Sequence, residues 1–240
     1  MSPEIMSLDG QRIVIIGGSS GIGFAVAALG CELGAKVVIA SRNKERVDAA
    51  VTRLNGTSGA AADLRDEAGV SRFFEHIGDF EHLVITANDW SGKPAPAPDM
   101  DLAAAHDAFE VRFWGALAAI QQGSRRIATN GTITLTSGML AHRPKKGAAL
   151  TTIVAGAIEH LARALAIDLA PIRVNAVCPG LTLTEHSRQM PELARQAFVA
   201  GLPLQRGASP EEAATAYVYA MLNGYVTGQI IPVDGGGSLV

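Results

Sequence analysis

The chain has 240 residues, of which 48% are hydrophobic and 18% charged, and its formal net charge is −3. This length and apolar content suffice for one substantial core, so we expect a single domain over residues 1–240. A slightly acidic chain whose basic runs are only dipeptides argues against nucleic-acid and acidic-membrane partners.

The N-terminal sequence lacks a basic segment followed by a long apolar run, so we expect no signal peptide. The apolar runs look too short to span a membrane. Two cysteines, Cys31 and Cys178, suit a reducing compartment better than a disulfide framework. The six histidines show no metal-ligand spacing. These features predict a cytoplasmic protein without a metal site.

Short apolar runs rich in β-branched residues alternate with longer helical patterns along the chain. Strands are expected at 12–17, 36–41, 58–63, 82–87, 132–137, 172–178 and 229–234. Helices are expected near 21–33, 43–54, 66–77, 100–122, 150–169 and 210–222. Strands that are apolar on both faces indicate a parallel sheet covered by helices on both sides. The pattern predicts a doubly wound α/β fold of the Rossmann type with seven strands.

The first expected strand is followed by GGSSGIG, which places Gly17, Gly21 and Gly23 between a strand and a helix. Glycine permits a tight turn and close backbone approach, and the free N–H groups of a helix start suit a pyrophosphate. A tight turn without any ligand would also be rich in glycine. Because the strand, the spacing and the helix agree, the segment predicts nucleotide binding.

Several motifs together resemble those of the short-chain dehydrogenase/reductase family. The glycine motif, ADL at 62–64, RVNAVCPG at 173–180 and TGQIIPVDGG at 227–236 match its motifs over almost the whole chain. The resemblance implies an NAD(P)-dependent oxidoreductase acting on a carbonyl, alcohol or imine-type group. It implies a cofactor site made of Gly17, Ser19, Ser20, Gly21, Ile22, Gly23, Ser41, Arg42, Asp63, Leu64, Ala87, Pro179, Gly180, Thr182 and Thr184.

The end of the second strand determines the choice of cofactor. An acidic residue there would bind the ribose hydroxyls of NAD and repel a 2′-phosphate. This chain has Ser41 and Arg42 instead, and a hydroxyl with a guanidinium suits a phosphate dianion. An arginine at the start of a surface helix is the ordinary alternative. The position favours NADP(H) over NAD(H).

The resemblance also shows which catalytic groups are missing. The family uses Ser, Tyr and Lys, commonly with Asn; Tyr exchanges the proton, and Lys lowers its pKa. Ser137 occupies the serine position, whereas Thr151 stands where Tyr belongs and Ala155 where Lys belongs. Arg112 takes the Asn position. Three of the four groups are absent, and the only tyrosines lie far along the chain at Tyr217, Tyr219 and Tyr225.

A rebuilt site would centre on Ser137, Arg112 and Thr151, with His142 as a candidate proton relay. The fixed charge of Arg112 would stabilise a developing oxyanion, and the two hydroxyls would hydrogen-bond it. The ordinary interpretation of His142 is a loop histidine facing water. Cys178 is more simply explained as a small buried filler.

Two functions remain open. The first is an NADP(H)-dependent oxidoreductase with a non-standard active site, whose substrate the sequence does not identify. The second is a catalytically inactive NADP(H)-binding protein that acts as a sensor or assembly partner. A lyase resembling the halohydrin dehalogenases is excluded, since those keep the catalytic Tyr and replace the nucleotide site.

Two further features concern the substrate side and assembly. A substrate lid is expected near 181–203, by resemblance to the family's most variable part. The expected helices at 100–122 and 150–169 are apolar over more than one face, and the chain ends in the apolar SLV. We therefore expect a homo-oligomer, a tetramer or a dimer.

Overall fold

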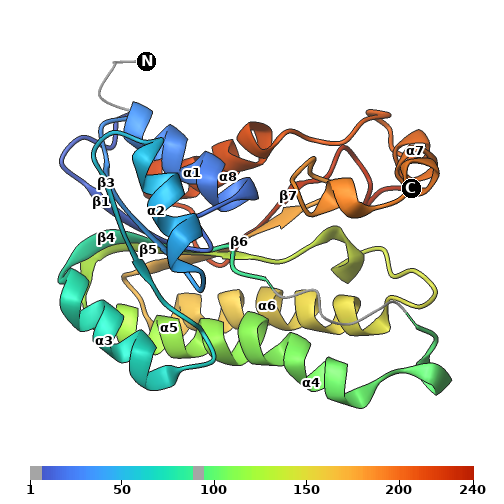
Figure 1. Ribbon diagram of the computed structural model, residues 1–240, viewed down its shortest axis with the longest axis horizontal. Coiled ribbons are helices and arrows are strands. Elements are labelled where there is room, and N and C mark those ends of the chain that lie inside the picture. Colours follow the sequence, from blue (N-terminus) through green and yellow to red (C-terminus); the bar gives the residue numbers. More distant parts are fainter. Residues whose placement is uncertain (1–6, 89–94) are drawn as a thin grey trace.

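Seven strands form one sheet in the order β3-β2-β1-β4-β5-β6-β7 in the computed structural model, which describes residues 7–88 and 95–240. The strands are β1 (Arg12–Ile16), β2 (Lys36–Ser41), β3 (Thr57–Ala61), β4 (Phe80–Ile85), β5 (Ile127–Thr136), β6 (Arg173–Pro179) and β7 (Ile230–Val233). All neighbouring strands are parallel. This architecture confirms the predicted doubly wound α/β fold (Figure 1).

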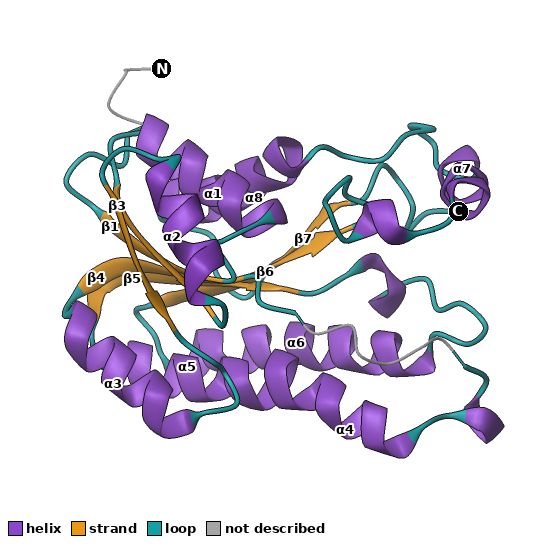
Figure 2. Ribbon diagram, in the orientation of Figure 1, coloured by secondary structure: helices purple, strands orange, loops and turns teal. Residues whose placement is uncertain are grey.

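Helices cover both faces of the sheet (Figure 2). One face carries α1 (Gly21–Glu32), α2 (Lys44–Thr52) and α8 (Pro210–Leu222). The other carries α3 (Glu67–Ile77), α4 (Leu102–Phe109), α5 (Ala116–Gly123) and α6 (Ala149–Asp168). The remaining helix, α7 (Glu192–Ala200), follows β6 in the chain. Three short helical turns lie in the loops: η2 (Ala97–Asp99), η4 (Met139–Ala141) and η5 (Ser187–Gln189).

Two apolar cores result from the alternation of side chains along each strand. In β1, Ile13 and Ile15 join the core beneath α1 and α8, whereas Val14 and Ile16 join the core beneath α3, α5 and α6. All four are fully or almost fully buried. Because both faces are covered, the strands are continuous apolar runs rather than alternating ones.

The helical segment predicted near 100–122 is found over 102–123, but its middle is not α-helical. A π-helical turn, η3 (Glu110–Gly115), separates α4 from α5. At the end of this turn the backbone approaches the residue that follows β3, since a Cβ on Gly115 would lie 2.6 Å from Leu64 Cβ. Turns of this kind are rare and occur frequently at functional sites. The turn carries Arg112.

Two other expectations need correction. Within the described residues, α6 alone is long and apolar enough to cross a membrane by length and composition, although no such run was expected. In the structure this helix packs on the sheet, burying Val154, Ile158 and Ala162. Helix α7 was not predicted either; it buries none of its residues, and Leu193 is exposed.

Candidate active site

The loops that carry the predicted site meet at the carboxyl edge of the sheet. The strand order reverses between β1 and β4, and ligands of doubly wound sheets bind outside the strand ends at such a point. The Thr86 and Ala87 N–H groups after β4 both donate to Ile16 O at the end of β1, at 2.8 and 3.1 Å. The loop after β5 is joined to β6 by a 2.8 Å bond from Ser137 N to Val177 O.

The glycine-rich turn leaves no room for side chains. A Cβ on Gly17, whose φ is +96°, would lie 2.5 Å from Ala87 N. One on Gly23 would lie 2.4 Å from Gly17 O, so only glycine permits this approach of α1 to β1. Ser20 precedes α1 without capping it through its side chain, and Ile22 lies in the first turn. The free N–H groups at the start of α1 suit a phosphate, and the binding of a pyrophosphate here stays a prediction.

The end of β2 is linked to the glycine-rich turn. Ser19 Oγ donates to Ser41 Oγ at 3.0 Å, and Arg42 follows as an exposed residue. The Ser41 hydroxyl therefore lies beside the turn that would hold the pyrophosphate, and Arg42 is the next residue along the chain. On the adenine side, Asp63 follows β3 and accepts a bond from Arg65 N at 3.0 Å, while Leu64 is buried.

The loop after β6 carries the predicted nicotinamide contacts. Pro179 ends the strand, and a Cβ on Gly180 would lie 2.7 Å from Asp234 Cα, so the loop lies tightly against the end of β7. Thr184 reaches across to the glycine-rich turn, where its Cγ2 would lie 3.2 Å from a Cβ on Gly21. Thr182 Oγ1 is buried without a hydrogen-bond partner, as are two other threonine hydroxyls in the described part of the chain. An unpaired buried hydroxyl is costly, which suits a group that binds a ligand.

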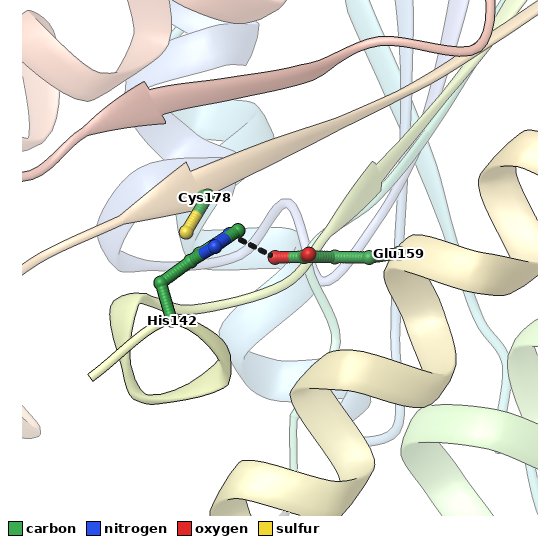
Figure 3. A group of neighbouring side chains, drawn as sticks. All are labelled: His142, Glu159 and Cys178. Atoms are coloured by element: carbon green, nitrogen blue, oxygen red, sulfur yellow. Dashed lines mark hydrogen bonds and ion pairs between the residues drawn. The ribbon is translucent and has the colours of Figure 1, made fainter. Parts of the chain in front are cut away.

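The side chains of Ser137 and His142 meet on a residue that was not predicted. Ser137 Oγ donates to Glu159 Oε1 at 2.8 Å, and His142 Nε2 lies 2.9 Å from the same oxygen. Figure 3 shows Glu159 reaching from α6 towards His142, which follows the short turn η4. Ser137 and Glu159 are both buried, at 4% and 3% exposure. His142 faces water as the ordinary interpretation expects, with its side chain 41% exposed, but its imidazole also contacts a buried carboxylate.

The sequence contained a signal for Glu159 that was overlooked. The buried face of α6 is an apolar stripe at helical spacing, and Glu159 is its one charged member: Val154, Ala155, Ile158, Glu159, Ala162 and Ala166. A carboxylate in such a stripe is expensive unless it is paired, so its presence favours a specific role. Ala155, where the family has Lys, leaves the space above Glu159 without a long side chain.

Arg112 is the second buried charge of the site. Arg112 is 8% exposed, and its Nη2 lies 3.5 Å from the Ser137 carbonyl oxygen. Burial lowers the pKa of Arg112 to about 10, which still leaves it a cation at neutral pH. Ser137 thus lies between a buried cation and a buried carboxylate. The predicted meeting of Arg112 with Ser137 is found.

Thr151 is not joined to this group. It is half-buried on α6, and its hydroxyl makes no hydrogen bond within the described residues. The tyrosines do not replace the missing phenol either. Tyr217 is fully buried in the core beneath α1 and α8, where its hydroxyl bonds Thr136 Oγ1 at 2.8 Å and burial raises its pKa. Tyr219 and Tyr225 are exposed on the surface.

Cys178 completes the cluster. It points from β6 towards His142 and Glu159 (Figure 3), and the three ligand atoms lie within 4.8 Å of one another. Burial, with smaller contributions from the carboxylates of Glu159 and Asp234, raises the pKa of Cys178 to about 11. The thiol is therefore neutral, in keeping with a buried filler. The spacing of the histidines did not suggest this group of potential metal ligands, because it joins three separate elements.

Two hollows lie away from this edge. One, of about 630 Å³, is lined by Gln11, His82 and Arg173 at the opposite end of the strands. The other, of about 1010 Å³, runs along α4, α5 and α6 beside Trp114. Neither includes a predicted site residue. The glycine-rich turn and the buried charges lie at the same edge of the sheet, so they identify the site more directly than these hollows do.

A glycine-rich turn at the strand-order reversal of a parallel sheet defines a dinucleotide-binding α/β protein. A family model described as enoyl-(acyl carrier protein) reductase matches residues 16–238. The short-chain dehydrogenase/reductase ATR9 of Stachybotrys chlorohalonatus is 34% identical, over 97% of this chain and 99% of its own. The chain therefore belongs to the short-chain dehydrogenase/reductase family of oxidoreductases.

Solved structures agree with this assignment. A small-chain dehydrogenase in complex with NADPH is 35% identical, with a TM-score of 0.84 over 97% of this chain and all of its own. A structure described as the MalC reductase/Diels–Alderase from Malbranchea aurantiaca is 31% identical, with a TM-score of 0.91 over 98% of this chain and 99% of its own.

Proposed function

We propose that the chain is an NADP(H)-dependent oxidoreductase that acts on a small carbonyl, alcohol or imine-type substrate through a non-standard active site. One observation carries the proposal. A glycine turn shaped for a pyrophosphate and a buried group of Arg112, Ser137 and Glu159 lie at the same edge of one sheet. A scaffold that only bound a nucleotide would have no need of two buried charges beyond it.

The preference for NADP(H) is supported by two facts. Ser41 and Arg42 end β2, where an acidic residue would favour NAD(H), and Ser19 ties this end to the glycine turn. A structural relative that is 35% identical is described in complex with NADPH. When bound, NADPH supplies the hydride of a reduction. Pro179, Gly180, Thr182 and Thr184 would hold its nicotinamide end, and Asp63, Leu64 and Ala87 its adenosine end.

The residues of this chain supply orientation and charge. Arg112 remains a cation, so it stabilises negative charge on the substrate oxygen but is too weak an acid to protonate it. Ser137 hydrogen-bonds the substrate heteroatom. Thr151 replaces a phenol by a short side chain and leaves room for a larger substrate or for water. Charged or delocalised acceptors should therefore react better than simple ketones.

The alternative is a catalytically inactive NADP(H)-binding protein that acts as a sensor or assembly partner. The observation that favours it is the loss of the Tyr–Lys pair. Ala155 has no ionisable group and the Thr151 hydroxyl is a far weaker acid than a phenol, so neither position replaces the missing general acid. The buried carboxylate beside Ser137 makes the enzyme the better-supported function.

The proposal extends to the setting of the enzyme. Residues 181–203, which include the exposed helix α7, would form a substrate lid on a single domain. Cys31 and Cys178 are both free thiols, which supports a cytoplasmic location. Exposed apolar side chains on α4, η3 and α6 support a homo-oligomer, a tetramer or a dimer.

A panel of charged, delocalised and simple acceptors with NADPH, followed at the nicotinamide absorbance, tests the function. We expect turnover of a charged or delocalised acceptor, and a fall of ~10²–10³-fold in Arg112→Ala, since removing one stabilising donor has that effect. Arg163→Ala is the matched control, because Arg163 is exposed on α6. NADPH binding without turnover of any acceptor would favour the inactive alternative. Activity that Arg112→Ala leaves unchanged would remove Arg112 from the site.

A further inference from the structure

We propose that Ser137, Glu159 and His142 form a proton relay that carries a proton from solvent to the substrate heteroatom. This inference rests on the proposed oxidoreductase function and supplies the proton donor that the missing Tyr leaves open. It assigns a role to Glu159, which the family resemblance does not suggest. Ser137 touches the substrate, and Glu159 and His142 act through it.

The geometry orders the three groups from inside to outside. Glu159 Oε1 receives the hydroxyl of Ser137 at 2.8 Å on one side and contacts His142 Nε2 at 2.9 Å on the other. The Glu159 side chain is 5% exposed, whereas that of His142 is 41% exposed. The imidazole therefore exchanges protons with water, and the carboxylate between it and the hydroxyl is sealed. Both distances are those of well-formed hydrogen bonds.

The burial of Glu159 is difficult to explain by stability alone. Its neighbours on the same face of α6 are Ala155, Ile158 and Ala162, and an apolar residue would pack there without loss of solvation. Replacing buried charges by apolar groups is often neutral or stabilising. A carboxylate kept at this position, bonded to one hydroxyl and one imidazole, therefore points to proton transfer.

The transfer balances as follows. A reduction adds a hydride to the substrate carbon and a proton to its heteroatom. Protonated His142 first gives its Nε2 proton to the Glu159 carboxylate, which becomes a carboxylic acid. The Ser137 hydroxyl turns to the heteroatom and gives up its proton there, while Ser137 Oγ accepts the proton from Glu159. Glu159 is again a carboxylate, and the neutral imidazole of His142 takes a proton from an acid in the solvent. Each O–H or N–H bond that breaks is matched by one that forms, and oxidation runs the same steps in reverse.

The charges around the relay are compatible with this role. Arg112 faces Ser137 from η3, Cys178 faces the cluster from β6, and Asp234 lies beyond the end of β7. Cys178 is a neutral thiol, and Arg112 places a buried cation beside the Ser137 carbonyl oxygen. A proton that enters on His142 adds one positive charge, which is discharged when the substrate is protonated.

Two other interpretations of the cluster are less well supported. A hydrolytic triad requires the histidine between the serine and the carboxylate, whereas here the carboxylate lies between the other two. A metal ion bound by His142, Glu159 and Cys178 would have to displace the proton of a thiol whose pKa is about 11. It would also lie near the buried Arg112 cation.

The relay is tested with His142→Gln and Glu159→Gln, which keep polar side chains of similar size but cannot pass a proton. His160→Gln is the matched control, because His160 is the next residue on α6 and its exposed ring bonds only the Gly156 carbonyl. The assay is single-turnover reduction, as a function of pH, of an acceptor from the panel whose heteroatom gains a proton. NADPH affinity by calorimetry and the imidazole N–H signal of His142 by NMR are measured alongside.

We expect both variants to lose ~10²–10⁴-fold in the rate of reduction while NADPH affinity is unchanged. The pH dependence of the reduction rate should differ between the wild type and His142→Gln. Glu159→Gln should shift the Nε2–H signal of His142, whereas His160→Gln should change none of these readouts.

The experiment distinguishes a failure of the proton relay from a failure of the proposed oxidoreductase function. Variants with the wild-type rate and pH profile overturn the relay and leave the oxidoreductase intact. A wild-type protein that binds NADPH and reduces no acceptor overturns the proposed function and the relay with it. Reduction that requires added Zn²⁺ and is lost in Cys178→Ser overturns the relay in favour of a metal site.

Discussion

His82 provides a prediction about stability that is independent of the active site. It lies on β4 and is buried at 3% exposure, where its ring nitrogens meet Thr132 Oγ1 and Gln11 Oε1. Burial, with a smaller contribution from the charge of Arg173, lowers the pKa of His82 from 6.5 to about 4. The folded state therefore binds fewer protons than the unfolded state between these values. The stability that His82 contributes is fully present above pH 6.5 and is lost as the pH falls towards 4.

The magnitude follows from the size of the pKa change. A fall from 6.5 to about 4 corresponds to about 3 kcal/mol of unfolding free energy, since one pH unit is worth about 1.4 kcal/mol. Urea denaturation at several pH values measures it. The wild-type protein should lose about 3 kcal/mol more than His82→Gln between pH 6.5 and 4. His76→Gln is the control, because His76 is exposed. Parallel pH profiles for the wild type and His82→Gln would refute the reasoning.

Three further predictions concern the cofactor and assembly. Arg42→Ala should weaken NADPH binding by ~10–100-fold in calorimetry and leave NADH binding unchanged. Lys44→Ala is the control and should affect neither cofactor, because Lys44 is a surface residue in a salt bridge with Asp48. Equal losses for both cofactors would contradict the 2′-phosphate contact. Gly23→Ala should abolish cofactor binding, because the new Cβ would lie 2.4 Å from Gly17 O. Gly156→Ala is the control and should bind the cofactor normally, because its Cβ would meet open space. Normal binding by Gly23→Ala would contradict the close packing of the turn. Trp114→Glu should convert an oligomer to smaller species in light scattering, since Trp114 is 57% exposed, and a wild-type monomer at micromolar concentration would contradict the assembly.

The layered fold was predictable because its signals are local. The runs RIVII and KVVIAS are apolar on both faces, and each begins and ends within one residue of the predicted strand. The glycine turn is a local signal too, since Gly17 and Gly23 are required by contacts between adjacent elements. The fold class follows from this alternation, whatever the chemistry of the site.

The parts that were not predicted depend on contacts between distant segments. The π-helical turn η3 follows from the approach of Gly115 to Leu64, which no helical period reveals. The pairing of Ser137 with Glu159 joins residues 22 apart in the chain, on a strand end and in mid-helix. A search for charged residues within the apolar stripe of α6 would have found Glu159. Its partners are visible only once the helix lies on the sheet.

The central claim is that this chain transfers a hydride from NADPH without a Tyr–Lys pair. The most direct measurement uses NADPH deuterated at its transferable position, a charged or delocalised acceptor, and mass spectrometry of the product. We predict one deuterium in the product with the wild-type protein. In Glu159→Gln the rate of incorporation should fall by at least ~10²-fold. A protein that binds the labelled NADPH yet places no deuterium in any acceptor would contradict the claim.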